Sequence, residues 1–115
     1  MTDLDKLQRM VVKFRDERDW KQFHNPKDLA ISLVLESTEF LEHFQWKTEA
    51  ETIEHLKNRK AEVDEELADV LYWVLLIAND LNINLDEAFV KKMVQNQAKY
   101  PITKAKGKHT KYTEL

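Results

Sequence analysis

The sequence predicts an all-α fold, and three observations support this. The chain has 115 residues but only two prolines and one glycine. The long segment between Pro26 and Pro101 contains neither residue type, so no strong helix breaker interrupts it. Apolar residues recur at helical spacing from Leu4 and Leu7 onward. We therefore expect one four-helix bundle-like domain over residues 1–115.

The first two helices can be placed from apolar spacing and from proline. The first follows a stripe that continues to Phe14. The second is expected to begin just after Pro26 and to run to about Gln45, with Leu29 and Leu33 on its apolar face.

The third helix has a clear start signal. Thr48 and Glu51 have the spacing of a capping box, in which each side chain satisfies a free backbone N–H of the other residue. An interruption is expected near Asn58, after which the helix continues through residues 70–78. This stretch is apolar on every side and is predicted to be buried all round.

The last predicted elements follow a turn over residues 79–84, where Asn82 or Asn84 suits a left-handed backbone. A fourth helix is expected over Leu85–Lys99. The segment from about Ile102 is rich in lysine and is expected to be a mobile, basic C-terminal tail.

A four-helix domain with one helix apolar on every side has more apolar surface than its own helices readily cover. We therefore expect a homo-oligomer, either a dimer or a tetramer. The alternative is that three helices and the tail suffice.

Composition excludes several classes of partner. A net charge of −3 disfavours a polynucleotide, although a single nucleotide is compatible with it. There is no cysteine, which excludes disulfides, zinc–thiolate sites and a thiol nucleophile. The first residues lack the features of a signal peptide, and residues 70–78 are too few to span a membrane. A cytoplasmic protein without a membrane partner is expected.

Two pairs of acids suggest chemistry. Glu36 and Glu39 are three residues apart, as are Glu66 and Asp69, so each pair shares one helix face. No lysine or arginine lies three or four residues from Glu36 or Asp69. Like charges about 4 Å apart repel by roughly 4 kcal/mol at an effective dielectric of about 20, so a cation should compensate them.

The kind of cation follows from the ligands. Carboxylate oxygens without cysteine suit a hard divalent ion, Mg²⁺ or also Mn²⁺. The alternative is that the acids form ordinary solvated helix faces. Glu62 and Asp64, which have Arg59 and Lys60 at helical spacing, are interpreted in that way.

The chain resembles the MazG-like group of all-α nucleotide pyrophosphohydrolases. The resemblance begins with the E-x-x-E and E-x-x-D motifs and extends over nearly the whole chain. It is closest to the dCTP pyrophosphatase branch, on four further segments: Arg18–His24, Phe44–Thr48, Lys99–Pro101 and Lys111–Leu115.

The resemblance implies Mg²⁺-dependent cleavage of a deoxynucleoside triphosphate into the monophosphate and pyrophosphate, with a role in nucleotide pool sanitation. Glu36, Glu39, Glu66 and Asp69 would bind the metal, and Glu36 or Glu39 would act as the catalytic base. The substrate is expected to be dCTP. Other substrates such as dATP or dUTP stay open, because Val11, Trp73 and Val94 depart from the branch.

The resemblance also implies a set of substrate contacts. Trp20, Trp46 and Trp73 would line the nucleobase pocket, with His24 near it. A face of the fourth helix would contact phosphate or sugar through Lys92, Asn96, Lys99 and Tyr100.

Two other interpretations compete with this one. A carboxylate-bridged di-iron bundle characteristically has Glu-x-x-His motifs, and no histidine of this chain has a glutamate three residues before it. A noncatalytic helical interaction module would use the acids as surface charges and would show no activity.

Overall fold

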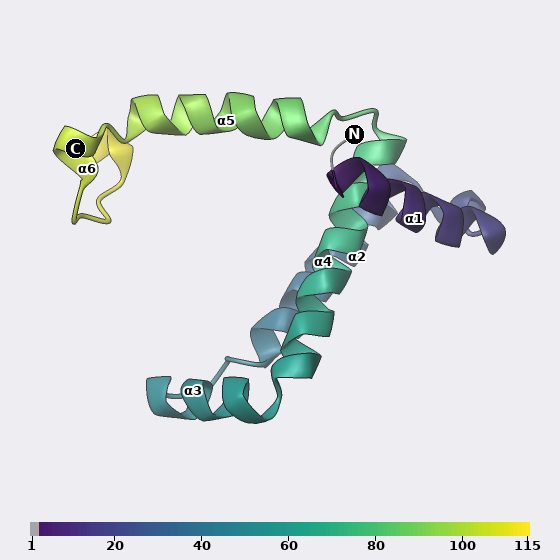
Figure 1. Cartoon of the computed structure of the whole chain (residues 1–115), viewed down its shortest axis with the longest axis horizontal. Helices are drawn as coiled ribbons and strands as arrows, with labels where there is room; N and C mark the ends of the chain where they lie inside the picture. The colour runs from purple at the N-terminus through teal and green to yellow at the C-terminus, as the bar shows by residue number, and fades with distance from the viewer. Residues whose placement is uncertain (1–2) are drawn as a thin grey trace. The chain divides into compact units, whose positions relative to one another are not determined.

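The computed structural model describes residues 3–115, and the elements in this range are helices without any strand (Figure 1). The all-α prediction is therefore confirmed. The helices are α1 (Asp3–Glu17), α2 (Pro26–Glu42), α3 (Glu49–Asn58), α4 (Lys60–Asp80), α5 (Leu85–Lys99) and α6 (Ile102–Ala105), with 3₁₀ turns η1 (Lys21–Phe23) and η2 (Tyr112–Glu114). None of the helices in this range is long and apolar enough to cross a membrane.

The chain forms two compact units, one extending to Ile83 and the other covering Asn84–Leu115. Each is described by itself. The assignment of the whole chain to one domain stays a prediction.

Local signals set the start of α2, and a backbone feature accounts for its end. The Asn25 side chain accepts a hydrogen bond from the Asp28 N–H, and Pro26 occupies the first turn, where its missing N–H costs nothing. The helix ends at Glu42 rather than near Gln45. In the turn that follows, Trp46 adopts a left-handed backbone with φ 68°, which a helix cannot include.

Helices α3 and α4 are separate, as the predicted interruption requires. The capping box between Thr48 and Glu51 is present, and the break falls at Arg59 (φ −125°, ψ 27°). His43, just after α2, and His55 in α3 are joined by a 2.8 Å contact between Nδ1 and Nε2. This contact ties α3 to the end of α2.

Helix α4 packs antiparallel to α2 and also contacts α1 (Figure 1). Leu75, Leu76 and Ala78 on its second half are buried together with Leu29 of α2. Within the predicted stretch, however, Leu71 is 38% exposed, and Leu67 just before it is 54% exposed. The prediction that this stretch is buried all round is wrong for this unit, because α1 and α2 cover only part of the circumference of α4.

An ion pair fixes the end of α1 to the end of α4. Arg15 is fully buried, and its Nη1 donates to Asp80 Oδ2 at 2.6 Å while its Nε donates to Asp16 Oδ1 at 3.2 Å. Gln8 adds a hydrogen bond to the backbone carbonyl of Leu75. The only strongly buried cation of the described residues therefore has two acidic partners.

In the C-terminal unit, α5 begins after Asn84, whose side chain accepts from the Glu87 N–H, and it has the predicted bounds. The segment from Ile102 contains α6 and η2 instead of a mobile tail. The Tyr112 ring lies edge-on to the Tyr100 ring, with 6.0 Å between their centres. The Lys99 ammonium lies 4.7 Å from the centre of the Tyr112 ring. These contacts hold the last residues against the end of α5.

Candidate active site

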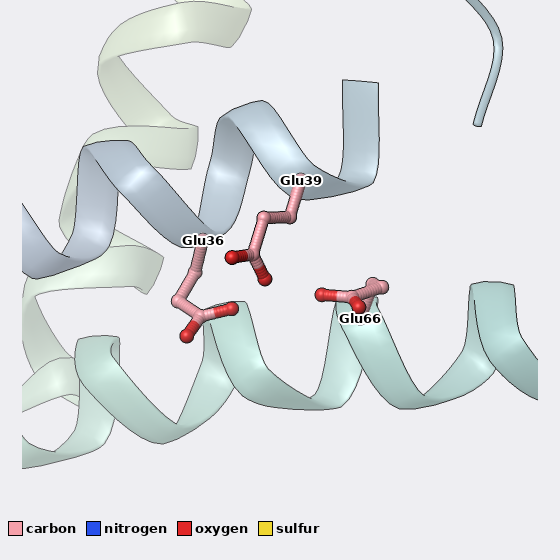
Figure 2. A group of neighbouring side chains, drawn as sticks. All are labelled: Glu36, Glu39 and Glu66. Carbon is pink, nitrogen blue, oxygen red and sulfur yellow. The ribbon is translucent and has the colours of Figure 1, made fainter. Parts of the chain in front are cut away.

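Three acids from two helices form a cluster (Figure 2). Glu36 and Glu39 project from the same face of α2, and Glu66 projects toward them from α4. One oxygen of each carboxylate lies within 4.8 Å of the others. The antiparallel packing of α2 and α4 thus brings together three of the four predicted metal ligands.

Among residues 3–115, no lysine or arginine compensates the charge of the cluster. Glu36 Oε2 and Glu66 Oε2 are buried and have no hydrogen-bond partner among the described residues. Burial raises the pKa of Glu36, and neighbouring carboxylates, first among them Glu39, raise it further. Burial and Glu39 also raise the pKa of Glu66, and only His43 acts in the opposite direction.

These residues fit a divalent cation. Buried oxygens without a partner carry a desolvation cost that a cation would offset. A set of carboxylates suits Mg²⁺ or Mn²⁺ better than the softer transition metals. The orphaned oxygens of Glu36 and Glu66 are therefore the natural ligand atoms, with Glu39 completing the set.

Asp69 occupies a different place. It is exposed and is not part of the three-carboxylate cluster. Its charge nevertheless raises the pKa of both Glu36 and Glu66, and it lines a cavity together with Glu36. Asp69 therefore stands at the edge of the site, and its role as a metal ligand stays a prediction.

An aromatic cavity of about 450 Å³ adjoins the cluster. Its rings meet edge to face: Trp20 with Phe14 at 5.7 Å, Phe14 with Tyr72 at 6.1 Å, and Tyr72 with Trp73 at 5.1 Å. The residues lining it are Met10, Val11, Phe14, Trp20, Glu36, Asp69, Tyr72 and Trp73. Two of the predicted base contacts, Trp20 and Trp73, thus share one cavity with two of the acids.

Sequence reasoning missed Phe14 and Tyr72 as residues of this cavity. Phe14 belongs to the apolar stripe that predicts the first helix. Tyr72 lies three residues after Asp69, so the spacing rule that paired the acids also places it on their face of α4. That signal was available in the sequence.

The other two predicted base contacts lie elsewhere. Trp46 is 91% exposed in the turn after α2 and does not line the aromatic cavity. His24 packs edge-on against Trp73 at 5.7 Å, but it lines a separate polar cavity of about 490 Å³ with Lys21 and Asp80. Burial and the charge of Arg15 lower the pKa of His24.

The predicted phosphate or sugar contacts belong to the C-terminal unit. Asn96 is partly buried and its amide lies 3.9 Å from Met93 Sδ, while the remaining three are exposed. The contacts of all four with substrate stay predictions: Lys92, Asn96, Lys99 and Tyr100.

The fold and the cluster define an all-α protein with an acidic site suited to a divalent cation and an aromatic cavity beside it. Comparison with known proteins narrows this class. The family model described as MazG-like matches residues 31–115. The chain belongs to the MazG-like family, as the motifs suggested.

Individual relatives agree with this assignment. dCTP pyrophosphatase 1 of Homo sapiens is 39% identical over 114 residues, which cover 97% of this chain and 67% of the human protein. The protein of the same name from Rattus norvegicus is 38% identical, with the same coverage. The crystal structure of a pyrophosphatase from Archaeoglobus fulgidus superposes with a TM-score of 0.81 at 42% identity, covering 88% of this chain and 94% of that one.

Proposed function

We propose that this protein cleaves a deoxynucleoside triphosphate, with dCTP favoured, into the monophosphate and pyrophosphate in a reaction that depends on Mg²⁺. The enzyme class, a nucleoside triphosphate pyrophosphatase, follows from the family and from the pyrophosphatases to which the chain is similar. The observation that carries the proposal is the cluster of Glu36, Glu39 and Glu66 beside an aromatic cavity.

The acids of the cluster bind cation rather than phosphate. A triphosphate carries about four negative charges and cannot approach three carboxylates unless divalent ions lie between them. The bound ion would stabilise the charge that develops on the phosphoryl oxygens. Glu36, Glu39 and Glu66 would hold it, and the exposed carboxylate of Asp69 could join them from the edge of the cavity.

One of these carboxylates also accepts the proton of the attacking water. A general base works best when its pKa lies near the working pH. The raised pKa of Glu36 brings it closer to that condition than an ordinary glutamate. We therefore favour Glu36 as the proton acceptor, through the carboxylate oxygen that does not bind the ion, with Glu39 as the alternative.

The aromatic cavity would receive the nucleobase. Stacking on an indole contributes roughly 1–3 kcal/mol per base, and Trp20 and Trp73 offer two such surfaces. Further proposed substrate contacts, carried by the family resemblance, are His24, Trp46, Lys92, Asn96, Lys99 and Tyr100.

Assembly and biological role belong to the same proposal. The exposed side chains of Leu67 and Leu71 on α4 support a homo-oligomer, because a second copy would remove them from water. Removal of unwanted deoxynucleotides in the cytoplasm would be the role of such an enzyme.

The reaction can be tested in water enriched in ¹⁸O. The protein is incubated with Mg²⁺ and with each of dCTP, dTTP, dUTP, dATP and dGTP, and the products are analysed by mass spectrometry. We expect pyrophosphate and a monophosphate that carries the label, because water attacks the α phosphorus. Release of inorganic phosphate would refute this cleavage, and absence of turnover with every nucleotide would favour a noncatalytic module.

A further inference from the structure

The wall of the aromatic cavity offers few groups that could recognise a base edge. Met10, Val11 and Phe14 are apolar. Glu36 and the nearby Asp69 belong to the acidic site. The indoles of Trp20 and Trp73 can donate a hydrogen bond but cannot accept one. One wall residue remains, and it is the only neutral side chain there that can both donate and accept a hydrogen bond.

Tyr72 is that residue, and its ring is held in place. It lies on α4 three residues after Asp69, on the same helix face. Its ring is partly buried and meets Phe14 at 88° and Trp73 at 80°, edge to face. Such pairs contribute about 0.5–1.5 kcal/mol beyond area burial, so the neighbours fix the direction of the phenol.

The hydroxyl of Tyr72 has no hydrogen-bond partner in the part of the chain that the structure describes. None of residues 3–115 forms a hydrogen bond with it, and its oxygen is not among the sealed, unpaired side-chain atoms of this range. It is therefore accessible to solvent, and the Tyr72 side chain lines both the aromatic cavity and a neighbouring pocket with Leu7 and Leu75. Burial raises the pKa of Tyr72, so the phenol is neutral at pH 7 and keeps its proton.

We propose, on the basis of the function proposed above, that the Tyr72 hydroxyl is a specificity-determining group that hydrogen-bonds the substituent at position 4 of a pyrimidine. With the triphosphate at the carboxylates, the base extends toward the aromatic wall. A hydroxyl accepts from the amine of cytosine and donates to the carbonyl of uracil. The hydroxyl therefore admits pyrimidine deoxynucleoside triphosphates with either substituent, dUTP as well as the favoured dCTP.

The test is Tyr72→Phe, which removes the hydroxyl and keeps the ring. Wild-type kcat/KM for dCTP and dUTP should agree within about tenfold, and the variant should lose about tenfold on both, the cost of one unmade hydrogen bond. Tyr112→Phe removes a hydroxyl from the C-terminal unit and should leave both values unchanged. The melting temperature of Tyr72→Phe should match that of the wild type.

Binding of the α,β-imido analogues of dCTP and dUTP, measured calorimetrically with Mg²⁺, separates this inference from the proposed reaction. A tenfold loss of affinity for both analogues in Tyr72→Phe supports the inference even if no nucleotide is hydrolysed. Unchanged affinity for either analogue overturns it, even if hydrolysis is observed. A wild-type preference between the two analogues greater than about tenfold also overturns it, because another group would then read position 4.

Discussion

Helix α4 carries acids in two places that differ in how their charge is compensated. Asp80 at its end receives a 2.6 Å hydrogen bond from the buried Arg15. Burial alone would raise the pKa of Asp80, but the hydrogen bond and charge of Arg15, with a hydrogen bond from Asn79, bring it below its ordinary value. Glu66, in the first half of the helix, faces two other glutamates, and its pKa is raised.

This difference in charge compensation distinguishes a structural acid, Asp80, from an acid of the candidate site, Glu66, within one helix. The chain itself supplies the counter-charge for Asp80, so that acid stabilises the packing of α1 on α4. No arginine or lysine of residues 3–115 compensates the charge of the cluster around Glu66. A charge that the fold leaves uncompensated marks the place where a ligand has to supply the compensation.

The largest expected effect is on the free energy of unfolding and concerns Asp80, whose charge Arg15 compensates. Asp80→Ala leaves the buried guanidinium of Arg15 without its main partner and should lower the free energy of unfolding by about 3–5 kcal/mol. Asp64→Ala, which breaks only the exposed pair with Lys60, should change it by less than about 1 kcal/mol. Urea denaturation measures both. A loss below about 1 kcal/mol for Asp80→Ala would show that the ion pair does not anchor α1.

The second effect concerns catalysis at the uncompensated cluster. Glu39→Gln preserves the volume of the side chain but removes one metal ligand, so kcat for pyrophosphate release should fall at least about a hundredfold. Glu62→Gln, in an exposed pair with Arg59, is the matched control and should keep full activity. Undiminished activity of Glu39→Gln would exclude that residue from the metal site.

The third effect is a pH dependence of metal binding. Glu36 and Glu66 must lose their protons to bind a cation, and both have a raised pKa. Mg²⁺ affinity should therefore fall, by up to about tenfold per pH unit for each proton displaced, as pH decreases through that raised range. Calorimetric titrations at several pH values measure the slope, which should be shallower in Glu36→Gln. A slope that is the same in both proteins would contradict the assignment of Glu36.

The smallest effect is on the stability of the metal-free protein. Because the pKa of Glu36 is higher in the folded state than in the unfolded chain, folding is penalised above this raised pKa. The penalty disappears as pH falls toward the ordinary value. Glu36→Gln should therefore melt a few degrees higher than the wild type at pH 7 without metal, and no higher at pH 4. A lower melting temperature at pH 7 would mean that the carboxylate has a structural partner.

Much of this architecture could be predicted because local sequence determines it. Asn25 and Pro26 start α2, the capping box starts α3, and α5 has its predicted bounds. The end of α2 could not be predicted, because the left-handed conformation of Trp46 is unusual for a bulky residue. The incomplete burial of α4 depends on which helices pack against it, and helical spacing does not encode that.

The residues of the site likewise include some that the sequence could predict and some that it could not. Spacing alone paired Glu36 with Glu39, since both lie on one helix. Which of Glu66 and Asp69 joins them depends on how α4 is rotated against α2, and the packing turns Glu66 toward the cluster. The pairing of Arg15 with Asp80 joins residues 65 positions apart, beyond the reach of any local rule.

Trp46 has a consequence for spectroscopy. The three tryptophans range from the 91% exposed ring of Trp46, through the 42% exposed Trp20, to the partly buried Trp73. An indole that is almost fully hydrated emits fluorescence at long wavelength and is accessible to iodide, whereas a partly buried one is shielded. A change in the fluorescence of Trp46 would therefore report the binding of a nucleotide, or of a second copy of the chain, over this residue.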